Sequence, residues 1–123
     1  MSYAGNNEAA ADPGLSVLLI MLRLQGIGAD PAQLRHRLGH RAVGVLEMLR
    51  CAKELGLKAR SYKTKWARLP STPLPGIAVL RDGDFIVLGK VAEDRAIVQS
   101  PHASRPTLMT RAELEAVWDG QWC

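Results

Sequence analysis

Three histidines and two cysteines supply the imidazole and thiol groups of this sequence, which are common zinc ligands. His36 and His40 are four residues apart, the spacing of two zinc ligands on one helical turn, and His102 or Cys51 could supply a third ligand. Gly39 interrupts that helix, however, and no Glu follows His36 in the pattern of a metalloprotease. We therefore expect surface histidines on a basic segment and no metal site.

The two cysteines are also the candidate nucleophiles. Cys51 falls beside Met48 and Leu55 in a helical pattern, which favours a small buried side chain over a reactive thiol. Cys123 follows Trp122 at the end of the sequence, far from any base that could activate it. We expect neither thiol to act as a nucleophile, and two cysteines without a disulfide framework fit a reducing compartment.

Residues 12–23 predict the first helix, whose start is where a nucleophile would be best placed. Its buried face is given by leucines at i, i+3, i+4 and i+7, namely Leu15, Leu18, Leu19 and Leu22. Asp12, Pro13 and Gly14 form its first turn, where a proline is tolerated. A thiolate there would be stabilised by the positive end of the helix dipole. Pro13 occupies this place and has no nucleophilic atom.

The elements that follow are first helical and then extended. Asp30-Pro31 predicts the start of a short helix that ends near Leu38, and residues 45–55 predict a third helix that ends at Gly56. Alternation over residues 57–62 predicts a half-exposed strand. The prolines within residues 63–75 predict a long irregular connection.

The second half predicts an antiparallel sheet and one more helix. Two apolar runs, residues 77–80 and 85–88, flank an Asp-Gly pair and predict a central hairpin that is covered on both faces. Residues 95–99 predict a further strand. Thr110 and Glu113 form a capping box for a helix that carries Trp118 inward and ends at Gly120. This order of elements indicates an α+β fold.

The net charge of +4 is unevenly distributed along the chain. Residues 35–68 contain ten Lys and Arg against Glu47 and Glu54, a net charge of +8, so the remaining residues carry −4. Such a basic stretch suits an acidic partner, an anionic surface or nucleic acid, and equally a solvated face with no partner.

The domain organisation is simple. Residues 1–11 are small and polar, lack the basic start of a secretory signal, and are expected to form a flexible N-terminus. The apolar run at residues 15–24 is too short to span a bilayer, which takes about 20 apolar residues. We expect one domain over residues 12–123, soluble by itself.

Several of these features occur in one order that resembles a known family. They are the helix after D-P-G-L, the stretch L-R-C-A-K-E-L-G-L-K-A-R, P-L-P-G-I-A-V-L, the D-G hairpin with F-I-V-L-G-K, and E-L-E-A-V-W-D-G. This series is similar to the N-terminal peptidase-like domain of type I secretion ABC transporters, the exporters of RTX toxins such as haemolysin. The resemblance implies a papain-like cysteine-peptidase fold, with a helical N-terminal lobe packed on a twisted antiparallel sheet.

The resemblance also implies three catalytic positions, and each is changed here. The parent bacteriocin-processing peptidases need a thiolate, an imidazole that takes its proton and an acid that orients the imidazole. Their positions correspond to Pro13, Asp84 and Ser100, and Asn7 is the nearest candidate for the oxyanion-side Gln. The resemblance therefore implies a catalytically inactive domain, not an enzyme.

The function that the resemblance implies is recognition without cleavage. The domain would hold the unfolded secretion substrate, an acidic RTX toxin or adhesin, before transport by the rest of the exporter, with a membrane fusion protein and an outer-membrane channel as further partners. It would lie at the cytoplasmic face of the bacterial inner membrane, with no cofactor in this domain. The residues assigned to substrate binding are Tyr62, Lys63, Lys65, Trp66, Leu80 and Phe85, although core packing is favoured for Trp66.

Two other interpretations of the sequence remain open. Three helices, a hairpin and a basic middle also fit a winged-helix module that binds nucleic acid. Asp82 and Asp84 at the supposed wing tip would repel phosphates, and the last strand and helix have no place in such a module. A still-active hydrolase would need another nucleophile, for which Ser16 is the nearest candidate.

Overall fold

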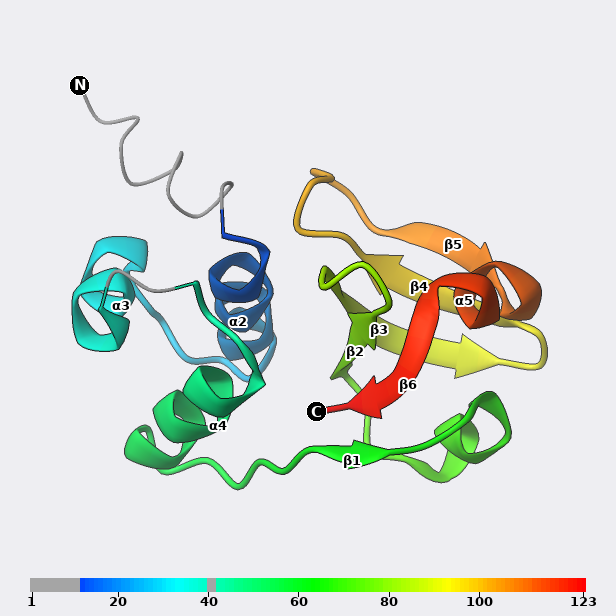
Figure 1. The fold of residues 1–123 in the computed structure, drawn as a ribbon, viewed down its shortest axis with the longest axis horizontal. Helices are drawn as coiled ribbons and strands as arrows, with labels where there is room; N and C mark the ends of the chain where they lie inside the picture. Colours follow the sequence, from blue (N-terminus) through cyan, green and yellow to red (C-terminus); the bar gives the residue numbers. More distant parts are fainter. Residues whose placement is uncertain (1–11, 40–41) are drawn as a thin grey trace.

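The computed structural model describes residues 12–39 and 42–123 and packs three helices against a six-stranded antiparallel sheet (Figure 1). These three N-terminal helices stand together at the left of Figure 1, and the sheet lies at the right together with a fourth helix near the C-terminus. In chain order the elements are α2 (Pro13–Leu24), α3 (Pro31–Leu38), α4 (Val45–Glu54), β1 (Tyr62–Lys63), the 3-10 helix η1 (Trp66–Ser71), β2 (Gly76–Leu80), β3 (Phe85–Ala92), β4 (Arg95–Gln99), β5 (Thr107–Thr110), α5 (Arg111–Val117) and β6 (Trp118–Trp122). This confirms the expected α+β class.

The first two helices begin in the same way. In each, an Asp caps the N-terminus and a Pro follows at the first helical position: Asp12 accepts from Leu15 N–H, and Asp30 accepts from Ala32 N–H. Helix α2 is followed by Gly26 at φ +77°, a left-handed conformation that glycine adopts without strain. The three predicted helices are confirmed, with ends within two residues of the expected positions.

The predicted hairpin forms the centre of the sheet. The strand order is β1-β6-β2-β3-β4-β5, and β2 pairs with β3 from Gly76↔Leu88 to Val79↔Phe85. Gly83 makes the turn with φ +88°. The wing of a winged-helix module is a hairpin that projects freely, whereas this hairpin lies in the middle of a six-stranded sheet. The winged-helix alternative is therefore wrong for this fold.

Both faces of the central hairpin are covered, because each carries its own hydrophobic core. On one face the α2 leucines pack against alternate hairpin residues, Ile77, Val79, Phe85 and Val87. On the other face the sheet curls so that β6 and α5 lie in front of β3 and β4 (Figure 1). That second core contains Trp66, Leu69, Ala78, Ile86, Leu88, Ala96, Val98, Leu114, Trp118 and Trp122. The expectation of covered central strands is confirmed.

The strand predicted over residues 57–62 is largely wrong. Only Tyr62 and Lys63 form β1, and they pair with Trp122 and Gln121 of β6. Residues 57–61 have no partner strand among the described residues, because the pairing of β1 with β6 ends at Tyr62↔Trp122. The stretch expected to be irregular, residues 63–75, includes the 3-10 helix η1, which buries Trp66 and Leu69.

The C-terminal prediction is only partly correct. The capping box is present, since Thr110 Oγ1 accepts from Glu113 N–H and the Glu113 carboxylate accepts from Thr110 N–H. The helix was expected to reach Gly120, but it ends at Val117 and residues Trp118–Trp122 form β6. Trp118 is buried as expected, but from a strand. Strand β5 was not predicted, because three of its four residues are exposed and give no alternation.

Some predicted features lie outside the described residues, namely the N-terminus 1–11 with Asn7, and His40. Within the described ranges, no helix is both long and apolar enough to cross a bilayer. The same ranges contain no group of three or more His, Cys, Asp or Glu side chains that could hold a metal ion.

Candidate functional site: the start of helix α2, the hairpin tip and the basic connection

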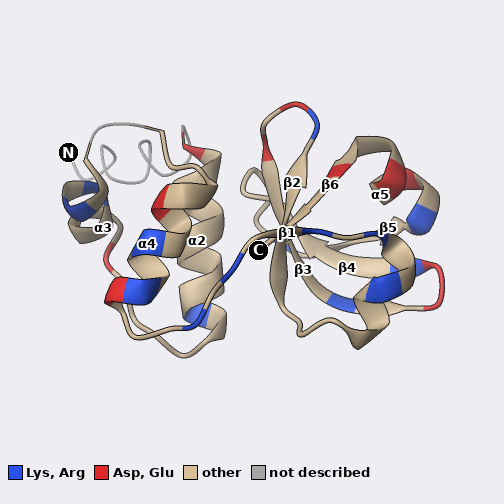
Figure 2. Cartoon of the chain, turned by 60° about the horizontal axis from the view of Figure 1, so that its bottom comes forward, with Lys and Arg blue, Asp and Glu red and all other residues tan. Residues whose placement is uncertain are grey.

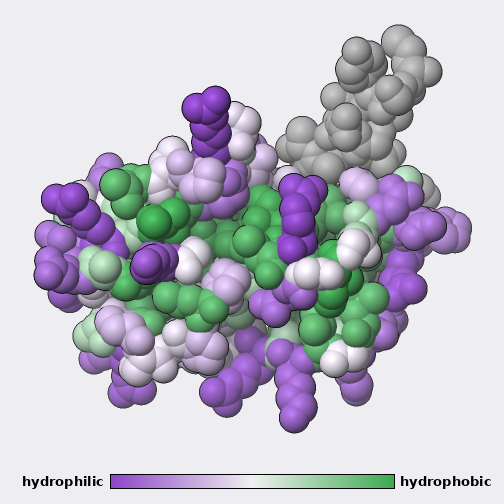
Figure 3. Space-filling model, turned by 180° about the vertical axis from the view of Figure 1, so that it is seen from behind, coloured by the Kyte–Doolittle hydropathy of each residue, from purple (hydrophilic) through white to green (hydrophobic). Residues whose placement is uncertain are grey.

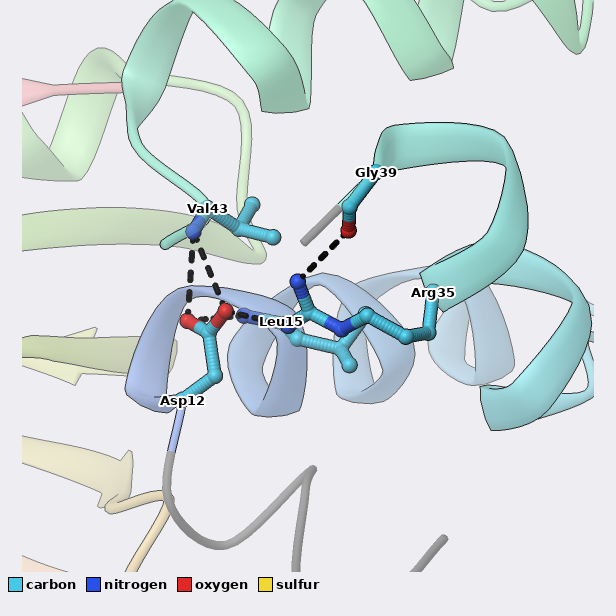
Figure 4. A network of polar contacts seen from close by, with 5 residues as sticks. All are labelled: Asp12, Leu15, Arg35, Gly39 and Val43. Atoms are coloured by element: carbon cyan, nitrogen blue, oxygen red, sulfur yellow. Dashed lines mark hydrogen bonds and ion pairs between the residues drawn. The ribbon is translucent and has the colours of Figure 1, made fainter. Parts of the chain in front are cut away.

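The start of α2 is a buried polar network in which Pro13 carries no nucleophilic atom (Figure 4). Asp12 is only 9% exposed, and its carboxylate accepts from Leu15 N–H at 3.3 Å and from Val43 N–H at 3.1 Å. The same carboxylate forms an ion pair with Arg35, whose Nη1 donates to the Gly39 carbonyl at 3.0 Å. One carboxylate thus ties α2 to α3 and to the segment that leads into α4. Because its oxygens are occupied by these donors, Asp12 serves as a structural anchor.

Gly14 lets the chain before α4 approach α2 closely. A Cβ atom added to Gly14 would lie 1.9 Å from the Val43 carbonyl oxygen, far inside a van der Waals contact. The position therefore requires glycine for space. This close approach also brings Val43 N–H within reach of Asp12. Asp12, Pro13 and Gly14 together explain why the start of α2 keeps its geometry without a reactive side chain.

The second assigned position, Asp84, is paired with a histidine at the tip of the central hairpin. Asp84 Oδ2 lies 2.8 Å from His102 Nε2, and Asp84 Oδ1 accepts from Phe85 N–H at 2.8 Å. The third position, Ser100, is joined to the same histidine, because Ser100 Oγ accepts from His102 N–H at 3.1 Å. An imidazole and a carboxylate therefore lie together, and this arrangement can accept and return a proton.

Sequence reasoning considered His102 only as a metal ligand and missed its partner. Val87 of β3 pairs with Gln99, the last residue of β4, and the turn that follows at residues 100–103 brings His102 beside Asp84. The strand pattern reveals neither this turn nor the register shift between Leu88 and Lys90, so the sequence alone did not pair the two residues.

Both thiols are held away from reactive chemistry. Cys51 is fully buried on α4, as expected, and this burial raises the pKa of its thiol. Burial likewise raises the pKa of the Cys123 thiol, with an opposing contribution from a hydrogen bond to Ser61. A thiol with a raised pKa is mostly protonated near neutral pH and is a poor nucleophile. The described residues thus contain no activated thiolate.

The six residues assigned to substrate binding do not form one surface. Trp66 is 3% exposed, and its indole N–H donates to the Glu93 carbonyl at 3.2 Å. Phe85 is 8% exposed and packs under α2, whereas the half-buried Leu80 packs with the opposite core. The burial of Trp66 confirms core packing and leaves almost no surface for a partner. Of the assigned residues, Lys63 and Lys65 are exposed, whereas Tyr62 is half-buried like Leu80 and packs on the same core.

The basic stretch is likewise divided by the fold. Arg35 serves the Asp12 network, and Arg37 lies 3.5 Å from Glu54 in an exposed pair. The cations in the connection from α4 to η1 are different, because Lys58 and Lys65 are exposed and have no acidic partner among the described residues. With the lower edge of the molecule turned forward, Figure 2 shows Lys and Arg along this connection.

A groove of about 520 Å³ lies beside this basic connection. Its lining includes Met21 and Gln25 of α2, Trp122 of β6, and the chain at residues 58–60 and 73–75. A smaller cavity of about 170 Å³ adjoins it and shares Met21, Gln25, Lys58, Ala59 and Cys123 with the groove. No Asp or Glu lines either space, so the groove is apolar with a positive rim.

Comparison with known proteins identifies secretion transporters as relatives. The cyclolysin secretion/processing ATP-binding protein CyaB of Bordetella pertussis is 37% identical over 113 residues, which is 89% of this chain and 16% of that protein. The alpha-hemolysin translocation ATP-binding protein HlyB of Escherichia coli O157:H7 is 25% identical over 119 residues, 94% of this chain and 17% of that protein. The chain therefore spans about a sixth of the length of these relatives.

Solved structures agree with these relatives in fold. The N-terminal peptidase C39-like domain of a toxin secretion ATP-binding protein from Vibrio parahaemolyticus matches with a TM-score of 0.78 and 25% identity, over 90% of this chain and 93% of that chain. The peptidase domain of Streptococcus ComA matches with a TM-score of 0.80 and 22% identity, over 90% and 88%. The peptidase C39 family pattern itself matches residues 3–122. This chain is therefore a member of the peptidase C39 family.

Proposed function

We propose that this chain is the substrate-recognition domain of a type I secretion ABC exporter and that it binds the unfolded secreted polypeptide without cleaving it. The relatives that support this proposal are named for cyclolysin secretion, alpha-hemolysin translocation and leukotoxin export. The substrate would accordingly be an RTX toxin or adhesin, presented before transport.

The observation that carries the proposal is the structure around Pro13. A cysteine peptidase needs a thiolate at the start of this helix to form a covalent intermediate. Pro13 supplies no nucleophile, the adjacent carboxylate is bound by Arg35 and two backbone N–H groups, and both thiols of the chain have a raised pKa. Asp84 and His102 could still transfer a proton, but proton transfer alone does not break a peptide bond without an attacking group.

A polypeptide ligand suits this fold. A double-glycine-motif protease from an AMS/PCAT transporter, with a TM-score of 0.80 and 21% identity to this chain, was solved in complex with its leader peptide. The fold therefore accommodates a peptide in that relative. We infer that the present chain retains peptide recognition while its nucleophile has been replaced.

The remaining partners follow from the same proposal. The domain would act at the cytoplasmic face of the bacterial inner membrane, joined to the membrane-spanning and ATP-binding parts of the exporter. A membrane fusion protein and an outer-membrane channel would complete the export path. We expect this domain to need no cofactor, because binding an unfolded chain requires only backbone and side-chain contacts.

The proposal is tested by NMR titration of the isotopically labelled chain with an RTX repeat polypeptide. Without calcium the polypeptide is unfolded, and we expect chemical-shift changes; with calcium it is folded, and we expect none. A second sample contains a double-glycine leader peptide and is followed by mass spectrometry for one day. No shifts with either form, or accumulation of cleaved leader peptide, would contradict the proposal.

A further inference from the structure

Residues 57–61 have the sequence pattern of a strand, yet they have no strand beside them in the described chain. They contain no turn, bend, helix or strand, and Lys58, Ala59 and Arg60 are exposed. These three residues make no backbone hydrogen bond to another described residue. Figure 1 shows the segment as a long trace along the lower edge between α4 and β1. It is therefore a row of accessible N–H and C=O groups.

The segment is nevertheless anchored at both ends. Its first residue is anchored, because Leu57 N–H donates to the Ala52 carbonyl at 2.8 Å. Its last residue is anchored too, because Ser61 Oγ accepts from the Gln121 side chain at 2.9 Å. The Arg60 guanidinium lies over the Tyr62 ring, 5.0 Å from its centroid, and such an i, i+2 contact arises when alternate side chains share one face. Little ordering is therefore needed before a second strand pairs with it.

The groove beside the segment carries charge of one sign. Lys58 and Arg60 line this 520 Å³ groove, which has no acidic lining residue. The exposed Lys65 follows further along the chain, whereas Lys63 lies 4.0 Å from the Asp119 carboxylate. Figure 3 shows hydrophilic side chains projecting from the lower edge of the molecule, along which the segment runs in Figure 1. The groove floor, which includes Leu74 and Trp122, is apolar. A ligand that fits this place carries both carboxylates and apolar side chains.

We propose that residues 57–61 are a docking strand for an extended acidic segment of the secreted polypeptide. This inference rests on the proposed function and names its binding surface. The incoming segment pairs through its backbone with residues 58–60, places carboxylates near Lys58 and Arg60, and sets apolar side chains in the groove. Backbone pairing tolerates many sequences, and electrostatic attraction speeds the encounter with an acidic chain.

Amide hydrogen exchange tests the backbone part of this inference. In the free chain we expect the amides of Lys58, Ala59 and Arg60 to exchange at rates close to those of an unfolded peptide. An unfolded, calcium-free RTX repeat polypeptide at saturating concentration should slow at least some of them about tenfold or more, since pairing protects amides from solvent. Protection of all three amides in the free chain, or none when the polypeptide is bound, would overturn the inference.

Charge reversal tests the electrostatic part. The double variant Lys58→Glu and Arg60→Glu should weaken binding of that polypeptide roughly tenfold at low salt, because two attractive contacts become repulsive. The matched control is Arg81→Glu with Arg105→Glu, two exposed cations elsewhere on the chain with the same change in net charge. An equal loss in both variants, or no loss in the first, would overturn the inference.

The two proposals fail in different ways. If the unaltered chain does not bind the unfolded polypeptide at all, the proposed function fails. If the polypeptide binds but gives residues 58–60 no protection from exchange, recognition stands and the docking strand is wrong. The same holds if the polypeptide binds the Lys58→Glu and Arg60→Glu variant as tightly as the unaltered chain.

Discussion

The two ends of helix α2 meet very different surroundings. At its N-terminus, Asp12 is buried and bound by Arg35, Leu15 N–H and Val43 N–H. At its C-terminal end, Met21 and the C-cap residue Gln25 line a groove beside residues 58–60, whose backbone groups make no hydrogen bond to another described residue. Polar contacts thus occupy the N-terminal end of α2, whereas the groove at its C-terminal end leaves room for a ligand.

This difference separates an end of α2 that holds the fold together from an end that, on the proposed function, faces the ligand. At the N-terminal end, Pro13 follows Asp12, which ties α2 to α3 and to the segment before α4. Accessible donors, acceptors and positive charge are instead gathered along residues 57–65. Substitutions at the N-terminal end of α2 should therefore change stability, and substitutions beside its C-terminal end should change binding.

The largest loss of stability is expected from substitution of Asp12. Asp12→Ala leaves Arg35 without its buried counter-charge, which typically destabilises a protein by about 3–5 kcal/mol. Asp30→Ala is a matched control, because Asp30 is also an N-cap before a Pro but is exposed, and its loss should cost about 1 kcal/mol. Urea unfolding of both variants measures the difference, and equal losses would show that the buried network adds nothing.

Substitution of Gly14 should give the next largest loss of stability. Gly14→Ala forces a methyl group against the Val43 carbonyl, and we expect a loss of at least about 2 kcal/mol in the free energy of unfolding. Gly28→Ala is the control, since nothing lies within 4 Å of the added Cβ and the residue is exposed. Thermal unfolding followed by circular dichroism compares the two. A Gly14→Ala chain as stable as the control would refute the close packing.

The Asp84–His102 pair should contribute less to the free energy of unfolding. His102 is 53% exposed, so His102→Ala should lower stability by less than about 1 kcal/mol. Binding of the unfolded polypeptide should be unchanged, because the docking strand is elsewhere. Fluorescence anisotropy with a labelled polypeptide measures binding, and a loss of more than about threefold would place recognition at the Asp84–His102 pair instead of residues 57–61.

The smallest effect on stability is expected beside the C-terminal end of α2. Lys58→Glu with Arg60→Glu alters only exposed side chains outside helices and strands, so the free energy of unfolding should stay within about 0.5 kcal/mol. The same variant is the one expected to lose polypeptide binding. A large loss of stability would mean that the segment supports the fold, and the contrast between the two ends of α2 would then disappear.

Much of the fold could be predicted from local chemistry. The two Asp-Pro starts, the glycines after the helices and the Asp-Gly hairpin act within a few residues, and each element they predict is present. Strands β5 and β6 were missed because their residues depend on distant partners. Helix α5 stops at Val117 since Trp118 and Trp122 are buried in the sheet, a tertiary effect that overrides helical spacing.

The site was predicted less well than the fold. Pro13, Asp84 and Ser100 could be assigned by resemblance, but the pairing of Asp84 with His102 depends on the turn that follows β4. The buried state of Trp66 depends on its indole N–H reaching Glu93 across the fold. The alternating pattern of residues 57–62 predicted a strand, but only Tyr62 and Lys63 form one, because a strand also needs a partner and local sequence does not supply one.

Native mass spectrometry tests most directly whether the chain recognises the secreted polypeptide without cleaving it. The chain is incubated with an unfolded, calcium-free RTX repeat polypeptide, and the masses of the complex and of the released polypeptide are recorded over several hours. We expect a one-to-one complex and a polypeptide of unchanged mass throughout. Fragments of the polypeptide that accumulate with time, or no complex at all, would contradict the account.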